Sequence, residues 1–119
     1  MTREEILAMK ADGLKLELSN AVATRIMGWH RHSTSGNWID DDGNARAHWR
    51  WSPERYIQNA WQVVEMMRNN SLASWLNFGD ALEEVIKTEG APVTTQTLIS
   101  FSLNPEAICK AALLAKGVE

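Results

Sequence analysis

Three histidines and a run of aspartates lie close together in the sequence and carry the ligand types of a metal site. His30 and His32 are two positions apart, so a strand would carry both on one face, and His48 follows in the same region. Such imidazoles, completed by a carboxylate from residues 40–42, could bind zinc and support a hydrolase. The alternative is that all three are solvated loop histidines, without the supporting hydrogen bonds that a metal site needs.

Other signatures of catalysis are weak or missing. The run that starts at Asp40 has glycine at its fourth position and Trp51 at its twelfth, where a calcium-binding EF-hand needs glycine sixth and glutamate twelfth. Cys109 lies in an alanine-rich apolar helix, where buried thiols are usually inert. The sequence has no GxSxG, no phosphate-binding glycine loop and no HExxH motif. We therefore expect a protein that is not an enzyme and uses no cofactor.

Basic and aromatic residues are interleaved through residues 29–55, which is the strongest local signal for binding. Arginine forms paired hydrogen bonds with phosphate or carboxylate, and tryptophan offers a stacking plane for a base or a cation. Both types also dominate protein–protein contacts. The alternative is that the tryptophans fill the core and the arginines form the solvated face of a strand. The candidate partner- or ligand-binding residues are Trp29, Arg31, Trp38, Arg46, His48 and Arg50.

The composition is that of a globular protein without a general attraction to nucleic acid. A chain of 119 residues is expected to form one domain, residues 1–119. Its 45% hydrophobic residues exclude wholesale disorder, and its net charge of −3 disfavours duplex nucleic acid as a partner. No apolar run is long enough for a bilayer, no secretory signal is evident, and one cysteine fits a reducing compartment. We expect a cytoplasmic protein that does not bind membranes.

Local patterns predict two N-terminal helices and a hairpin. Thr2 and Glu5 have the spacing of a capping box, and Asp12-Gly13 fits the end of this short helix. Apolar residues at three- and four-residue steps predict a second helix over residues 14–27, ended by Gly28. Asp42-Gly43 predicts a hairpin turn, and the alternation over residues 45–51 predicts its second strand.

The second half is predicted to be mainly helical. Ser52-Pro53-Glu54 is a typical helix start, followed by an apolar stripe that includes Trp61 and reaches Asn69-Asn70. Residues 71–78 fit a strand or a helix, whereas residues 80–88 fit a helix with Glu83 and Glu84 in its first turn, ended by Gly90. The threonine- and serine-rich residues 93–103 predict a strand. Asn104-Pro105 starts the last helix, which Gly117 ends.

Three blocks of sequence occur in an order and spacing that match a known family. They are Val22-Ala23-x-x-Ile26-Met27-Gly28-Trp29, Trp51-Ser52-Pro53 running into Ala60-Trp61-x-Val63-Val64-Glu65, and Ala107-Ile108-Cys109-Lys110-Ala111-Ala112-Leu113. Together they resemble the phage ABA sandwich domain family of small phage and prophage proteins. The resemblance covers most of the chain in patches, implies a bacterial cytoplasmic location and carries no catalytic residues with it. The chain departs from the resemblance in residues 71–91, where we expect a strand-rich sequence but find a helix-like one.

The predicted fold class is α+β, a single compact α/β sandwich in which a small antiparallel sheet is packed by about four to five helices. The predicted function is that of a small non-enzymatic phage- or prophage-encoded accessory protein. It would bind and modulate a host protein, for example as a counter-defence inhibitor. A sponge that sequesters a small nucleotide and a small metal-assisted hydrolase remain open, as does a homo-oligomer formed through the alanine-rich helix or a sheet edge.

Overall fold

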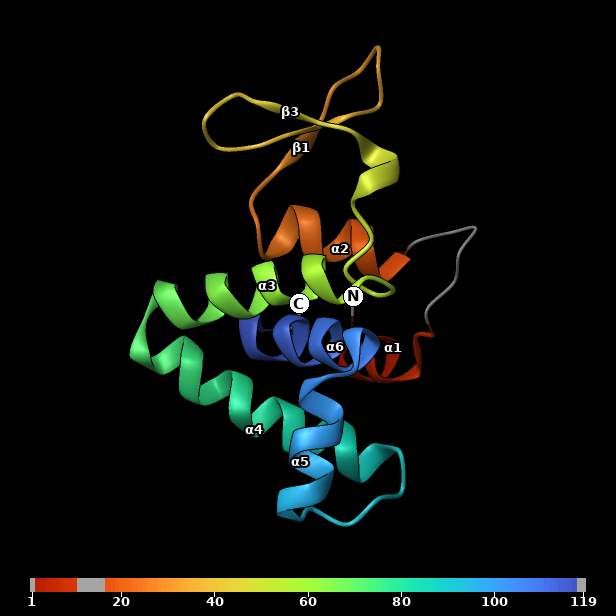
Figure 1. The fold of residues 1–119 in the computed structure, drawn as a ribbon, viewed down its shortest axis with the longest axis vertical. Coiled ribbons are helices and arrows are strands. Elements are labelled where there is room, and N and C mark those ends of the chain that lie inside the picture. The colour runs from red at the N-terminus through yellow and green to blue at the C-terminus, as the bar shows by residue number, and fades with distance from the viewer. Residues whose placement is uncertain (1, 11–16, 118–119) are drawn as a thin grey trace.

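Helix α6 (Pro105–Lys116) is the central element of the structure, a computed structural model that describes residues 2–10 and 17–117, apart from the side chain of Trp49. Asn104 caps the helix by accepting a hydrogen bond from the backbone N–H of Ala107 at 3.1 Å. Residues 107–114 are all buried, and α6 packs against the other five α-helices of the described chain (Figure 1). The predicted start at Asn104 and end at Gly117 are confirmed.

The N-terminal part forms helices α1 (Arg3–Ala8) and α2 (Glu17–Arg25), both in contact with α6. The predicted capping box is present: the hydroxyl of Thr2 accepts the N–H of Glu5 at 3.1 Å, and the Glu5 carboxylate accepts the N–H of Thr2 at 3.2 Å. Helix α2 is the predicted docking helix, with Leu18 and Val22 fully buried. The predicted cap at Asp12-Gly13 and the helix start at residue 14 lie outside the described residues.

Helices α3 (Ile57–Asn70) and α4 (Leu72–Thr88) form a helical hairpin with Ser71 at its corner. The hydroxyl of Ser71 accepts the N–H of Ser74 at 3.0 Å and so caps α4 directly after α3 ends. Of the ambiguous residues 71–78, Ser71 is the cap and residues 72–78 are helical, so the helix predicted from residue 80 begins at Leu72 instead. The predicted stop near Gly90 is confirmed, since Gly90 has a φ of +80°.

The predicted start of α3 at Ser52-Pro53-Glu54 is wrong. These residues form a separate turn, in which the carbonyl of Ser52 accepts the N–H groups of Arg55 at 3.0 Å and Tyr56 at 2.8 Å. Tyr56 then has an extended backbone, with φ −106° and ψ 119°, so the regular helix begins only at Ile57. The side chain of Asn59 accepts the N–H of Ser52 at 2.9 Å and ties the turn to the helix.

Residues 30–46 form a three-stranded antiparallel sheet in the order β1-β2-β3, and this confirms the predicted hairpin at Asp42-Gly43. The strands are short: β1 (His30–Arg31), β2 (Trp38–Ile39) and β3 (Ala45–Arg46). In their register, Trp38 of the middle strand pairs with Arg31 on one side and Arg46 on the other. The carboxylate of Asp40 accepts the N–H groups of Asp42 at 3.0 Å and Asn44 at 2.9 Å, which stabilises the turn.

The strand predicted over residues 45–51 ends after Arg46 and gives way to a short 3₁₀ helix, η1 (His48–Arg50). The alternation failed because the chain turns back to α2 at this point. The indole N–H of Trp51 donates to the carbonyl of Ser19 on α2 at 3.1 Å, and its ring packs against Trp29 with centroids 4.6 Å apart. These contacts anchor the hairpin to the helices.

The strand predicted over residues 93–103 is wrong, because these residues form helix α5 (Thr95–Ser102). The threonines that suggested a strand make a capping box instead: Thr94 accepts the N–H of Thr97 at 3.2 Å, and Thr97 accepts that of Thr94 at 2.8 Å. Side chain–backbone bonding of this kind overrides the β propensity of threonine.

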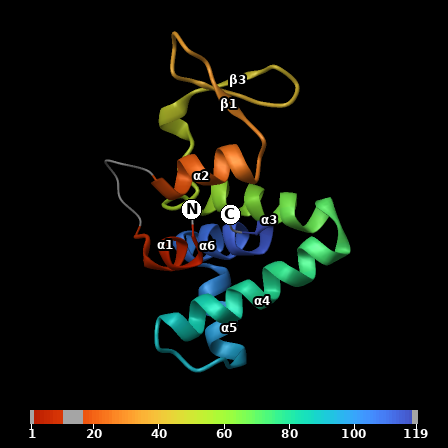
Figure 2. The same ribbon diagram turned by 180° about the vertical axis from the view of Figure 1, so that it is seen from behind.

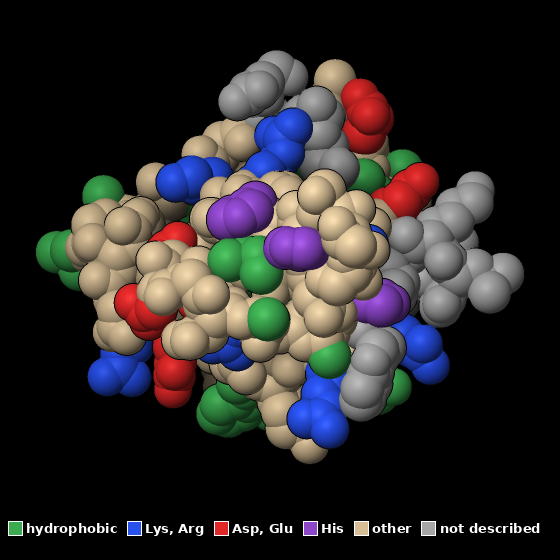
Figure 3. Space-filling view, turned by 90° about the horizontal axis from the view of Figure 1, so that it is seen from above, with side chains coloured by type: hydrophobic (Ala, Val, Ile, Leu, Met, Phe, Trp, Pro, Cys, Tyr) green, Lys and Arg blue, Asp and Glu red, His purple; other side chains and the backbone are tan. Residues whose placement is uncertain are grey.

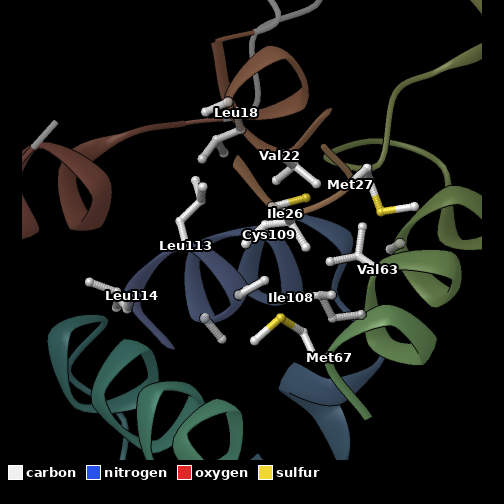
Figure 4. Close-up of a cluster of buried hydrophobic side chains, with 14 of the residues drawn as sticks. Leu18, Val22, Ile26, Met27, Val63, Met67, Ile108, Cys109, Leu113 and Leu114 are labelled. Atoms are coloured by element: carbon white, nitrogen blue, oxygen red, sulfur yellow. The ribbon is translucent and has the colours of Figure 1, made fainter. Parts of the chain in front are cut away.

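The core lies where α2, α3 and α4 meet the central helix. Val22 of α2, Val63 and Met67 of α3, and Ile108 and Leu113 of α6 pack together with Cys109 (Figure 4). Because residues 107–114 are buried within the chain, the alanine-rich helix does not offer a small-residue face to a second copy.

The predicted α+β class is confirmed, with six α-helices and the small sheet in the described residues. The sheet lies at one end of the long axis and α5 at the other, as both ribbon views show (Figures 1 and 2). Among the helices described, none is by itself long and apolar enough to cross a membrane. Helices α5 and α6 meet this criterion only as a pair, bent by 95°.

Candidate functional site

A groove of about 610 Å³ opens between helices α3, α4 and α5 and reaches the start of α6. Large apolar side chains form most of its lining: Trp61, Val64, Trp75, Leu76, Leu98 and Leu103. Binding pockets of proteins have volumes in this range and are lined mainly by apolar and aromatic side chains. We call this feature the apolar groove.

Several side chains of the apolar groove are exposed to solvent. Trp61 is 53% exposed, Leu76 59% and Leu103 55%. The prediction that Trp61 lies on the core stripe of its helix is therefore wrong, because α3 buries Ala60 and Val63 instead. Clustered large apolar side chains on a surface mark interaction sites, whereas single scattered ones do not. The apolar groove is therefore a candidate interaction surface of the described chain.

The apolar groove exists because α4 has apolar residues on two of its faces. Phe78, Leu82 and Val85 are buried, which is the single stripe that a surface helix normally needs. Trp75 is the partly exposed end of this stripe, three positions before Phe78, whereas Leu76 lies beside the stripe, and both line the groove. In the sequence, this wall of the groove corresponds to more apolar residues at helical spacing than one buried stripe needs. The pattern did not indicate a groove, because residues 71–78 also fitted a strand.

The charged side chains of the apolar groove are acidic. Asp80 and Glu83, three positions apart on α4, both line it, and its described lining contains no lysine or arginine. Glu83 and Glu84 were predicted in the first turn of a helix, yet they lie in the middle of α4. Glu84 forms an ion pair with Arg3, whereas Glu83 faces the groove.

The structure brings the predicted binding residues of the hairpin together but does not expose their tryptophans. Trp29 and Trp38 are both buried. The guanidinium group of Arg46 lies over the Trp29 ring, and that of Arg31 over the Trp38 ring, each 4.7 Å from the ring centroid. Within the hairpin the arginines therefore occupy the ring faces on which a base would stack.

Three of the predicted polar residues of the hairpin are bonded to their neighbours. Arg31 donates to the side chain of Asn20 at 3.2 Å, and Arg46 to the carboxylate of Asp40 at 3.3 Å. The His48 ring contacts the side chain of Asn37 at 3.2 Å. The Arg50 side chain is exposed on the same part of the molecule. Seen from above, both basic and acidic side chains lie around this end of the molecule (Figure 3).

The pKa of Asp40 lies below its usual value. The main cause is the hydrogen bond from the backbone N–H of Asn44, with further contributions from Arg46 and from the N–H of Asp42. Asp40 is therefore a structural acceptor that holds the hairpin turn closed.

Comparison with protein families identifies the family to which this chain belongs. The phage ABA sandwich domain matches residues 20–113, which is most of the chain. The chain belongs to the phage ABA sandwich domain family. The resemblance seen in its three sequence blocks is thereby confirmed. Comparison with curated proteins and with solved structures finds no match.

The phage ABA sandwich domain is not a known enzyme family, and membership makes this chain a phage-associated protein. In this member, both the hairpin and the apolar groove fall within the matched range. The strands that the resemblance led us to expect in residues 71–91 are not present in the described structure, where α4 occupies residues 72–88 and its exposed side chains form one wall of the apolar groove.

The histidines of this phage ABA sandwich domain do not gather into a metal site. His30, His32 and His48 appear as separate patches (Figure 3), and no group of three metal-ligating side chains occurs within the described ranges. The ring nitrogen of His32 accepts the N–H groups of Thr34 and Ser35, both at 3.2 Å, and so supports a loop. All three histidines are exposed, His30 in β1, His32 in the loop that follows and His48 in η1, which favours solvated histidines over a metal site.

Cys109 is fully buried in α6 of the same domain. Burial raises the pKa of its thiol well above the usual value, and the negative charges of Glu54 and Glu106 raise it further. A thiol that keeps its proton is a poor nucleophile. Cys109 therefore acts as a packing residue, as its alanine-rich surroundings predicted.

Proposed function

We propose that this phage ABA sandwich protein is a non-enzymatic accessory protein that binds a partner protein through the apolar groove. The observation that carries the proposal is the cluster of exposed Trp61, Leu76 and Leu103 around one groove. Tryptophan and other large apolar side chains in a concave site are the typical anchors of protein–protein contacts. A phage-encoded protein of this kind would act in the bacterial cytoplasm on a host factor, for example as a counter-defence inhibitor.

A nucleotide sponge is less well supported by the geometry. Such a protein needs cationic side chains for phosphate and an open aromatic plane for the base. The described lining of the apolar groove has no lysine or arginine, and in the hairpin the arginines already cover Trp29 and Trp38. The hairpin residues Arg31, Arg46, His48 and Arg50 therefore have a structural role in this proposal, as the support of the small sheet.

Two leucines of α4 provide a matched test. Leu76 and Leu72 are one helical turn apart, are 59% and 73% exposed, and differ in that only Leu76 lines the apolar groove. Tagged wild-type, Leu76→Ser and Leu72→Ser proteins are used to capture partners from host lysate. We expect a stoichiometric host protein with wild type and Leu72→Ser and its loss with Leu76→Ser. Capture that is independent of Leu76 would contradict the proposal, as would release of a nucleotide without any protein.

A further inference from the structure

The elements that surround the apolar groove limit what can bind there. Its lining residues come from α3, α4 and α5, from the end of α5 at Leu103, and from Ile108 of α6. Backbone groups inside helices bond within the helix, so these walls offer no strand edge to an extended peptide. A bound segment must therefore satisfy its own backbone hydrogen bonds, and a helix does this by itself.

The charge of the apolar groove points to a basic occupant. Asp80 and Glu83 lie one turn apart on α4, and the described lining contains no cation to balance them. A second copy docked about a two-fold axis would bring the same two carboxylates of each chain into one interface, where they would repel. A partner with lysine or arginine beside its apolar face would instead place opposite charges there.

Gly79 marks where the occupant can approach α4 most closely. The residue lines the apolar groove between Leu76 and Glu83, and a Cβ atom added to it would meet no atom within 4 Å. Because glycine has no side chain, the backbone of α4 is accessible at this point to a side chain from the partner.

We infer that the apolar groove binds an amphipathic α-helix of a partner protein, with apolar anchors on one face, lysine or arginine on its flank, and a crossing point at Gly79. This inference rests on the proposed function and specifies the partner's chemistry. In such helices the anchors recur at i, i+3 or i+4, and i+7.

The test is a selection from a displayed library of random 16-residue peptides on the intact wild-type protein. We expect enriched peptides with apolar residues at helical spacing and an excess of lysine and arginine. One synthesised consensus peptide should gain helical circular dichroism on binding. Enriched sequences that alternate with period two, that are acidic, or that fail to emerge at all would overturn the inference.

Substitutions in the groove test the same inference on the consensus peptide. We expect Gly79→Trp to weaken binding at least tenfold by filling the groove, while Gly79→Ala changes it less than threefold. The charge reversal Asp80→Lys with Glu83→Lys should weaken binding by about fivefold per lost pair. The matched control Asp41→Lys with Asp42→Lys makes the same charge change at the distant hairpin tip and should leave binding unchanged. If the two double variants weakened peptide binding equally, the inference that the bound helix carries lysine or arginine on its flank would be overturned.

Failure of this inference is distinguishable from failure of the proposed function. Leu76-dependent capture of a host protein together with non-helical or acidic library peptides would leave the proposed function standing and overturn the helical occupant. If neither Leu76-dependent capture nor helical, basic library peptides were observed, both the proposed function and the inference would be overturned. A wild-type dimer in light scattering that Leu76→Ser converts to a monomer would show that a second copy fills the groove, which overturns the inference of a partner helix.

Discussion

The rings of Trp75 and Phe78 lie against each other with centroids 5.9 Å apart, yet Phe78 is buried while Trp75 is 39% exposed. Both line the apolar groove, so the pair joins the core stripe of α4 to its exposed wall. An exposed tryptophan held by a buried ring is positioned before a partner arrives, which lowers the entropic cost of ordering it on binding. This continuity explains how a small helical protein can present a rigid apolar surface.

Gly79→Ala should raise the stability of the protein. Gly79 lies inside α4, where glycine is about 1 kcal/mol less favourable than alanine, and the added methyl group would meet no atom within 4 Å. We expect the free energy of unfolding in urea, followed by circular dichroism, to rise by about 1 kcal/mol. A lower stability would contradict this expectation and show that the added methyl group clashes with neighbouring atoms.

Replacing both Arg46 and Arg50 with alanine should weaken the fold without affecting partner capture. Arg46 loses its place over the Trp29 ring, an interaction worth about 1 kcal/mol. Urea unfolding measures the loss, and Arg68→Ala, at an exposed position of α3, serves as the control with little expected change. Loss of capture by a folded double variant would instead assign partner binding to the hairpin.

Lys110→Ala should be strongly destabilising. The Lys110 side chain is 1% exposed, and its ammonium group donates to the carbonyl of Leu7 at 3.1 Å and pairs with Glu106 at 3.1 Å. The ammonium group is buried while Glu106 is 25% exposed, so loss of its charged hydrogen bonds should cost about 2 kcal/mol. Lys110→Met keeps the aliphatic stem and should recover part of this loss, and Lys116→Ala on the same helix should be nearly neutral. A Lys110→Ala protein as stable as wild type would show that this contact contributes nothing.

Cys109 should make stability fall at alkaline pH. Burial raises the pKa of the folded thiol, so above the unfolded pKa of about 8.5 the unfolded chain releases a proton that the folded chain keeps. This contribution is therefore complete below pH 8.5 and declines by up to about 1.4 kcal/mol per pH unit above it. The decline should be shallower in Cys109→Ala, and the native thiol should resist iodoacetamide until the protein unfolds. If the free energy of unfolding fell equally steeply with pH in wild type and Cys109→Ala, Cys109 would not be the source of the decline.

The parts of the fold that follow from local side-chain chemistry could be predicted from the sequence. The capping box of Thr2 and Glu5, the turn at Asp42-Gly43 and the start of α6 at Asn104 each depend on bonds within five residues. Such contacts form in the same way whatever the rest of the chain does.

The parts of the fold that depend on distant contacts could not be predicted from the sequence. Residues 45–51 alternate as a strand does, yet the bond from Trp51 to Ser19 on α2 turns the chain away from the sheet. Residues 93–103 failed for a different, local reason: threonine favours both a strand and a helix cap, and the capping box of Thr94 and Thr97 prevails. The apolar groove escaped prediction because a helical spacing of Trp75 and Leu76 does not say which of them meets another helix.

The most direct measurement is the dissociation constant of the captured partner for wild-type, Leu76→Ser and Leu72→Ser proteins, determined by calorimetry. An anchoring leucine in a desolvated groove should contribute at least about 1.4 kcal/mol, a tenfold change in affinity. We predict at least this loss for Leu76→Ser and less than a twofold change for Leu72→Ser. Equal affinities of the two variants would contradict the assignment of the apolar groove as the binding site.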